Sequence, residues 1–216
     1  VNKISSETGG VISAIACDVT DVNQIETTFQ KLINDHGRVD ILVNNAGTSS
    51  ASPFDETSDE VWDYDIELKV YGAIRCSRIA VEHMKNQGGG RIVNITTPGG
   101  KAPGPSSVPT SVSRAAGIAL TKAMSKDLAS DNILVNTVGV GLIKSGQHRR
   151  RWEKINEQDA NVSLDDFYED MGSRVPMGRV GEAKEVGSVV AFLVSDRGSY
   201  VTGASINVDG GTSPVV

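Results

Sequence analysis

A run of positive charge and the three histidines are the first residues of this sequence that could do chemistry. Residues 148–151 read His-Arg-Arg-Arg and precede Trp152. They can hold an anionic substrate or the phosphate of a cofactor, although a solvated charged surface is the alternative interpretation. His36 and His83 fall near expected helix ends and read as surface residues. His148 is therefore the one histidine that we expect near a substrate.

The composition excludes several classes of partner. The chain has 216 residues, with 21 Lys and Arg against 27 Asp and Glu, and a formal net charge of −6. That balance argues against a nucleic-acid binder, which needs a basic face. No apolar run approaches the ~18 residues of a membrane span, and no signal segment opens the chain. Cys17 and Cys76 stand alone, without a CxxC or histidine-rich cluster, so we expect no metal site and a reducing, cytoplasmic setting.

Short β-branched runs alternate with helical stretches, which is the pattern of parallel βαβ units. The expected strands are residues 11–16, 39–43, 91–95, 133–138 and 204–208. Capping residues and helical spacing predict helices that begin at Asp21 and Thr57 and others over 111–129 and 182–195. The polar stretch 145–175 is too long for a plain connection and predicts a lid or insertion. We interpret 1–216 as one α/β domain.

Six segments of the sequence, taken together, indicate a protein family more specifically than any one of them does alone. They are "CDVTD" (17–21), "VDILVNNAG" (39–47), "GRIVNI" (90–95), "ILVNTVGVGLIKS" (133–145), "PMGRVGEAKEVGSVVAFLVSD" (176–196) and "SYVTGASINVDGG" (199–211). In this order and spacing, over nearly the whole chain, they resemble the short-chain dehydrogenase/reductase family. The resemblance implies a doubly wound, Rossmann-like parallel sheet, NAD or NADP as cofactor, a small alcohol or ketone as substrate, and a homotetramer or homodimer.

The opening of the family pattern is not in this sequence. Members begin with a strand, a glycine-rich TGxxxGxG turn and a second strand, and the turn lets backbone amides approach a pyrophosphate. The residue after that second strand distinguishes NAD from NADP, so both cofactors stay open. The sequence starts at Val1, in a segment that has the pattern of the last turns of a helix. We therefore expect a longer natural chain, of which this sequence lacks the first βαβ unit.

The resemblance places cofactor contacts where the expected strands end. The positions are Asp18 and Val19 beside the adenine, Asn45, Ala46 and Gly47 under the ribose, and Gly141, Ile143 and Ser145 at the nicotinamide. Small residues let backbone pass close to a ligand. Ordinary strand ends and turns are the alternative interpretation of these positions.

The four positions that carry the family's chemistry hold other residues here. The family uses a Tyr-x-x-x-Lys pair on one helix face, a serine before it and an asparagine on the preceding helix. Counted from "GRIVNI", the serine position is Thr97, the tyrosine is Thr110, the lysine is Arg114 and the asparagine is Lys69. Thr97 keeps a hydroxyl. Arg114 keeps a cation for the ribose, although a guanidinium is not interchangeable with an ammonium.

The exchange of tyrosine for Thr110 is the largest departure. A phenol has a pKa of about 10 that a protein can lower, whereas an aliphatic hydroxyl does not titrate in the usable range. Lys69 can serve as the replacement acid if burial lowers its pKa, although an exposed helix lysine is the simpler expectation. Among the tyrosines, Tyr168 in the 145–175 region is the one that can reach a pocket. We expect Tyr200 to have a structural rather than a catalytic role.

Three functions remain open at this point. The first is an NAD(P)-dependent oxidoreductase with unconventional catalysis. The second is a non-catalytic relative that binds a dinucleotide or another ligand. The third is a structural subunit of an oligomer, whose contacts would use the alanine-rich helix 111–129 and the last strand. Hydride turnover, cofactor binding and solution mass distinguish the three.

Overall fold

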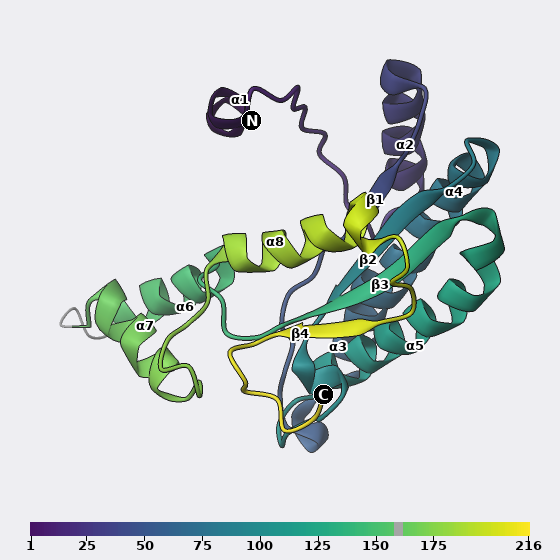
Figure 1. The fold of residues 1–216 in the computed structure, drawn as a ribbon. Coiled ribbons are helices and arrows are strands. Elements are labelled where there is room, and N and C mark those ends of the chain that lie inside the picture. Colours follow the sequence, from purple (N-terminus) through teal and green to yellow (C-terminus); the bar gives the residue numbers. More distant parts are fainter. Residues whose placement is uncertain (158–161) are drawn as a thin grey trace.

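A four-stranded parallel sheet lies at the centre of the computed structural model, which describes residues 1–157 and 162–216 (Figure 1). The strand order is β1-β2-β3-β4. The strands are β1 (Ile41–Asn44), β2 (Gly90–Thr96), β3 (Ile133–Val140) and β4 (Ser205–Val208). These confirm four of the five expected strands, with ends shifted by one or two residues.

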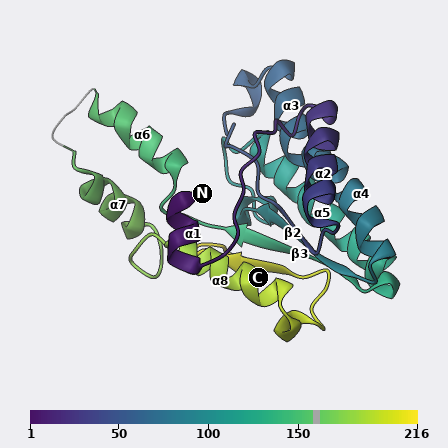
Figure 2. The same ribbon diagram turned by 90° about the horizontal axis from the view of Figure 1, so that it is seen from above.

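Helices cover both faces of the sheet, as a doubly wound fold requires (Figures 1 and 2). One face carries α4 (Gly72–Asn86) and α5 (Thr110–Leu128), with α2 (Val22–His36) against α4. The other face carries α8 (Ala183–Val194). A short α1 (Asn2–Thr8) opens the chain. The α/β class is confirmed, and so are the helices expected after Asp21, over 111–129 and over 182–195.

Alternation along β2 and β3 fills an apolar core on each face of the sheet. Ile92 and Val135 belong to the core under α2, α4 and α5, whereas Val93 and Val138 pack toward Leu193 of α8. All five are at most 1% exposed. Because both faces of a parallel sheet are covered, its central strands are buried on both sides. This core fixes the sheet edge at which the carboxyl ends of the strands meet.

The strand expected over 11–16 is wrong. These residues run from α1 to α2 outside the sheet, and Val11 is 96% exposed (Figure 1). Strand β1 is the last strand of the described sheet on that side and leaves Ile41 and Val43 exposed. An apolar run becomes a strand only beside a partner that satisfies its backbone groups. No described strand offers 11–16 that partner.

The long helix expected from Thr57 is interrupted. It starts one residue later, with Ser58 as the N-cap of α3 (Asp59–Ile66), and a π-helical turn over Glu67–Tyr71 joins α3 to α4. A π-helical turn adds a residue to the ordinary helical turn, which rotates the side chains that follow, and such turns are frequent at functional sites. This one carries Lys69, which is buried.

The 145–175 region forms two helices that project from the sheet (Figure 1). They are α6 (Gly146–Asn156) and α7 (Leu164–Ser173), and the residues between them at 158–161 lie outside the described ones. The pair has its own apolar contacts, centred on Phe167 and Met171. Among the described residues, no helix has the length and apolar character needed to cross a membrane.

Candidate active site

Four polar side chains from two helices meet beside the carboxyl ends of β1 and β2. The Lys69 ammonium pairs with Asp65 and donates a hydrogen bond to Thr110 Oγ1 at 3.1 Å. Ser113 Oγ donates to the other carboxylate oxygen, Asp65 Oδ2, at 2.6 Å. The side chains of Lys69 and Asp65 are 1% and 0% exposed. We call Asp65, Lys69, Thr110 and Ser113 the lysine cluster.

Local sequence places these side chains on facing helix surfaces. Asp65 precedes Lys69 by four residues, the spacing and order at which an acid and a base pair along a helix. Thr110 begins α5 and Ser113 follows three residues later, so both face the same way. The backbone N–H of Ser50 also donates to Thr110 Oγ1, at 2.9 Å. The loop after β1 is thereby tied to the cluster.

The hydrogen bonds to Thr110 determine what its hydroxyl can do. A hydroxyl has one proton to donate and two lone pairs that accept. Lys69 and the Ser50 N–H engage both lone pairs of Thr110 Oγ1. Its proton is therefore available to an acceptor, such as an oxygen that becomes negative during a reaction, and the Lys69 ammonium can replace that proton.

Burial sets the chemistry of Lys69. Loss of hydration lowers the pKa of Lys69 below its ordinary value, Asp65 opposes that change through its hydrogen bond and charge, and the Arg114 guanidinium adds to it. The simpler expectation of an exposed helix lysine is therefore wrong. The physical reason is the packing of α5 over the π-helical turn, which the sequence pattern of one helix does not reveal.

Arg114 lies one turn after Thr110 on α5 and reaches the sheet edge. Its Nη1 donates to the Ile95 carbonyl oxygen at 2.8 Å, and its Nε is buried without a partner among the described residues. Burial lowers the pKa of Arg114, with Asp65 opposing. A Cβ at Gly47 would lie 2.8 Å from Nη2, so the absence of a side chain at Gly47 gives the guanidinium its place.

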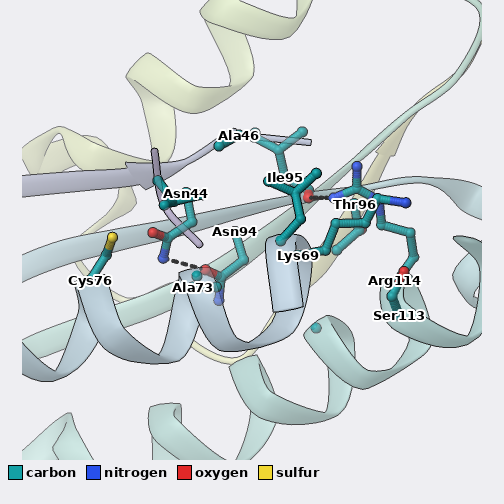
Figure 3. Close-up of a pocket in the computed structure, with 14 residues that line it drawn as sticks. Asn44, Ala46, Lys69, Ala73, Cys76, Asn94, Ile95, Thr96, Ser113 and Arg114 are labelled. Atoms are coloured by element: carbon teal, nitrogen blue, oxygen red, sulfur yellow. Dashed lines mark hydrogen bonds between the residues drawn. The ribbon is translucent and has the colours of Figure 1, made fainter. Parts of the chain in front are cut away.

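Lys69 and Arg114 line a small pocket together with residues at the carboxyl ends of β1 and β2 (Figure 3). Its volume of about 30 Å³ holds a water molecule or two. Four of the positions expected from the sequence line it, and these are Val19, Ala46, Lys69 and Arg114. In Figure 3, Cys76 lies at one end of the pocket and Arg114 at the other. The structure thus brings two catalytic candidates and two cofactor candidates to one place.

The remaining candidates lie around this centre or away from it. Thr97 is half-buried at the turn after β2 and does not line the pocket. Asp18 is exposed, and its Oδ1 accepts from the backbone and side chain of Thr20, which caps a turn. Asn45 and Gly47 are exposed on the loop that follows β1. Their backbone is open to a ligand.

The segment after β3 forms a different neighbourhood. A Cβ at Gly141 would lie 2.6 Å from the Asp209 backbone, so close packing of strand ends explains that glycine. Ile143 is 7% exposed and lines a second cavity of about 510 Å³ against Gly181. Ser145 caps α6 by accepting from the His148 N–H at 3.3 Å.

The other chemistry candidates stay outside the lysine cluster. His148 Nδ1 lies 2.8 Å from the Ile143 carbonyl oxygen, and Arg149 faces Glu153 on the exposed surface of α6. Tyr168 packs on Phe167 within the α6–α7 pair. Tyr200 is fully exposed, so its expected structural role does not operate within this chain.

Two members of the cluster were not predicted from the sequence. Asp65 stands among apolar helix positions with Lys69 four residues later, and Ser113 lies one residue before Arg114. The acid–base spacing along the helix was the available signal. Asn44 and Asn94 were not predicted as site residues either. Asn44 ends β1, Asn94 interrupts the apolar run of β2, and the two share a hydrogen bond of 2.8 Å beside the pocket (Figure 3).

The residues at this edge fit the nicotinamide end of a dinucleotide. Gly47 and Ala46 leave the backbone after β1 uncovered, and Arg114 presents a cation with an unpartnered buried N–H beside them. These are the properties that a ribose hydroxyl and a passing phosphate ester require. Arg114, Ala46 and Gly47 would hold that part of the cofactor.

The chain resembles known proteins over almost its whole length. A family model described as enoyl-(acyl carrier protein) reductase matches residues 1–213. The 3-oxoacyl-(acyl-carrier-protein) reductase FabG of Thermotoga maritima is 35% identical over 202 residues, which cover 94% of this chain and 77% of that protein. The structure of L-sorbose reductase from Gluconobacter frateurii, complexed with NADPH and L-sorbose, has a TM-score of 0.93 at 27% identity, covering 100% of this chain and 82% of the other. An NAD⁺-bound xylitol dehydrogenase has a TM-score of 0.83 at 30% identity, covering 97% and 84%.

Proposed function

The chain belongs to the short-chain dehydrogenase/reductase family, and on that premise we propose that it is an NAD- or NADP-dependent oxidoreductase acting on a small alcohol or ketone. The contact between Lys69 and Thr110 carries this proposal, because it supplies a proton donor where the family's phenol is absent. The two cofactors stay together in the proposal, since the similar structures include an NADPH complex and an NAD⁺ complex.

The proposed chemistry gives each residue of the cluster a task. When bound, the reduced nicotinamide supplies a hydride to a carbonyl carbon. The Thr110 hydroxyl donates its proton to the carbonyl oxygen and takes a proton from the Lys69 ammonium in return. Thr110 thus regains its neutral form and Lys69 becomes a neutral amine. Oxidation of an alcohol runs the same transfers in reverse. A general acid of this kind contributes about 10²–10⁴-fold to a rate.

The cofactor positions complete the proposal. We assign the ribose to Arg114 and the loop Asn45-Ala46-Gly47, the adenine to Asp18 and Val19, and the nicotinamide to Gly141, Ile143 and Ser145. Thr97 keeps the hydroxyl that polarises the substrate carbonyl. In this proposal residues 1–216 form one dinucleotide-binding domain of a cytoplasmic enzyme, with 145–175 as its substrate lid.

Nicotinamide absorbance tests the proposal directly. The wild-type protein should oxidise NADH or NADPH in the presence of a panel of small ketones. Lys69→Met and Thr110→Val should each lower kcat by about 100-fold. Lys126→Met is the matched control, because it replaces an exposed lysine on α5, the helix that carries Thr110. It should keep the wild-type rate. Unchanged turnover in Lys69→Met would remove the lysine from the reaction.

A non-catalytic relative is the second candidate, and the ion pair favours it. A lysine paired with a buried carboxylate can have a purely structural role. In addition, the four catalytic positions of the family all hold other residues in this chain. This candidate predicts that NAD or NADP raises the melting temperature while no ketone is reduced. Lys69→Met would then leave cofactor affinity unchanged.

We further propose that the chain forms a homodimer or homotetramer through α5. Val112, Ala115, Ala119 and Ala123 are exposed along one side of that helix, and their small size permits a second helix to approach closely. Sedimentation at micromolar concentration should show more than a monomer. Ala119→Glu should shift the protein toward the monomer, and a wild type that sediments only as a monomer would refute the assembly.

A further inference from the structure

Asp65 and Ser113 occupy the centre of the lysine cluster without belonging to the family's four catalytic positions. Both oxygens of the Asp65 carboxylate are engaged, one by Lys69 and the other by Ser113. Ser113 Oγ also lies 3.0 Å from the Thr110 carbonyl oxygen, in the first turn of α5. Ser113 is 2% exposed and Asp65 is 0% exposed. The carboxylate therefore links the helix that carries Lys69 to the turn that carries Thr110.

We propose that Asp65 is a positioning residue that holds the Lys69 ammonium against Thr110 Oγ1, with Ser113 fixing the carboxylate in place. The inference rests on the proposed proton transfer from Lys69, which it deepens. A lysine side chain has four rotatable bonds and would otherwise sample several directions. The ion pair on one side and Thr110 on the other restrict it to the geometry that transfer needs.

The charged groups around Lys69 determine how readily it releases its proton. The charged groups that act on its ammonium are Asp65 from α3 and the Arg114 guanidinium from α5. With Lys69 protonated, the site holds two cations and one carboxylate. Loss of the Lys69 proton leaves one of each, so Arg114 favours release of the proton and Asp65 favours its retention. Removal of Asp65 should tip this balance strongly toward a neutral Lys69.

The decisive measurement does not require turnover. The Lys69 side-chain nitrogen is titrated by NMR in the cofactor-free protein, assigned with Lys69→Arg. Asp65→Asn should move the titration of Lys69 to lower pH than in the wild type. Asp63→Asn removes a charge from the exposed side of the same helix and is the matched control, expected to leave Lys69 unchanged.

Turnover gives the second readout. Asp65→Asn should lower kcat for ketone reduction by about 100-fold near neutral pH, with little change in KM and with its pH optimum moved to more acidic values. Ser113→Ala should lower kcat by about tenfold, whereas Ser113→Thr, which keeps the hydroxyl, should recover most of it. Ser111→Ala removes another buried hydroxyl of α5 outside the cluster and should keep the wild-type rate.

The outcomes test the positioning role of Asp65 and the proposed oxidoreductase function separately. A folded Asp65→Asn protein with the wild-type Lys69 titration and pH profile would overturn the positioning role. If Asp65→Asn does not fold, Ser113→Ala and Ser113→Thr decide, and equal pH profiles in both would overturn it. A wild type without ketone reduction would refute the proposed function, and the Lys69 titration would still decide whether Asp65 positions the lysine.

Discussion

Replacing Lys69 by methionine should destabilise the protein far more than a surface lysine substitution does. Methionine keeps the length of the stem but removes the cation beside Asp65, whose side chain is 0% exposed. Removing one partner of a buried pair costs about 3–5 kcal/mol, because the remaining charge is neither hydrated nor compensated. Typical domains unfold at a cost of only about 5–15 kcal/mol. The ion pair thus controls a large part of the stability.

A double variant distinguishes charge from packing. Lys69→Met with Asp65→Leu removes both charges and fills the site with apolar side chains, so most of the lost free energy of unfolding should return. Urea unfolding at a constant m-value measures the wild type, Lys69→Met, Asp65→Leu and the double variant, and these four free energies of unfolding give the coupling energy of the pair. The reasoning is refuted if Lys69→Met alone costs less than about 1 kcal/mol, the range of exposed ion pairs. It is equally refuted if the double variant is no more stable than the single one.

Three further predictions concern neighbouring residues. If the wild type lacks a general acid, as the second candidate function has it, Thr110→Tyr with Arg114→Lys restores a phenol and an ammonium on one helix face and should raise ketone reduction by about 100-fold, measured by nicotinamide absorbance against Thr110→Phe. Burial raises the pKa of the Cys76 thiol to about 11 from 9.0, so its contribution to stability is complete below pH 9 and is lost as the pH rises through 11. That loss amounts to about 3 kcal/mol, and urea unfolding of Cys76→Ala should lack this alkaline decline. Gly47→Ala should displace the Arg114 guanidinium and weaken dinucleotide binding by about tenfold in calorimetry, with the melting temperature nearly unchanged.

The sequence by itself determined the α/β class, the order of four strands and the helices between them. These features depend on the alternation of apolar residues and on caps within each segment, which are local properties. The end of α1 at Gly9 and the start of α2 at Asp21 show this, since each is set by residues next to the helix end. The motifs also singled out Thr110, Arg114 and Lys69, which lie close together in the structure.

Only the tertiary structure decided which of those side chains meet. Lys69 is buried because α5 packs over the π-helical turn that carries it, and neither the turn nor the packing partner can be deduced from the pattern of one helix. Asp65 and Ser113 are 48 positions apart in the sequence, and only the folded chain brings them into hydrogen-bond contact. The segment 11–16 has a strand-like sequence but no neighbouring strand in the described sheet. Burial and pairing belong to the assembly of elements, so the chemistry of Lys69 follows from its surroundings rather than from its place in the sequence.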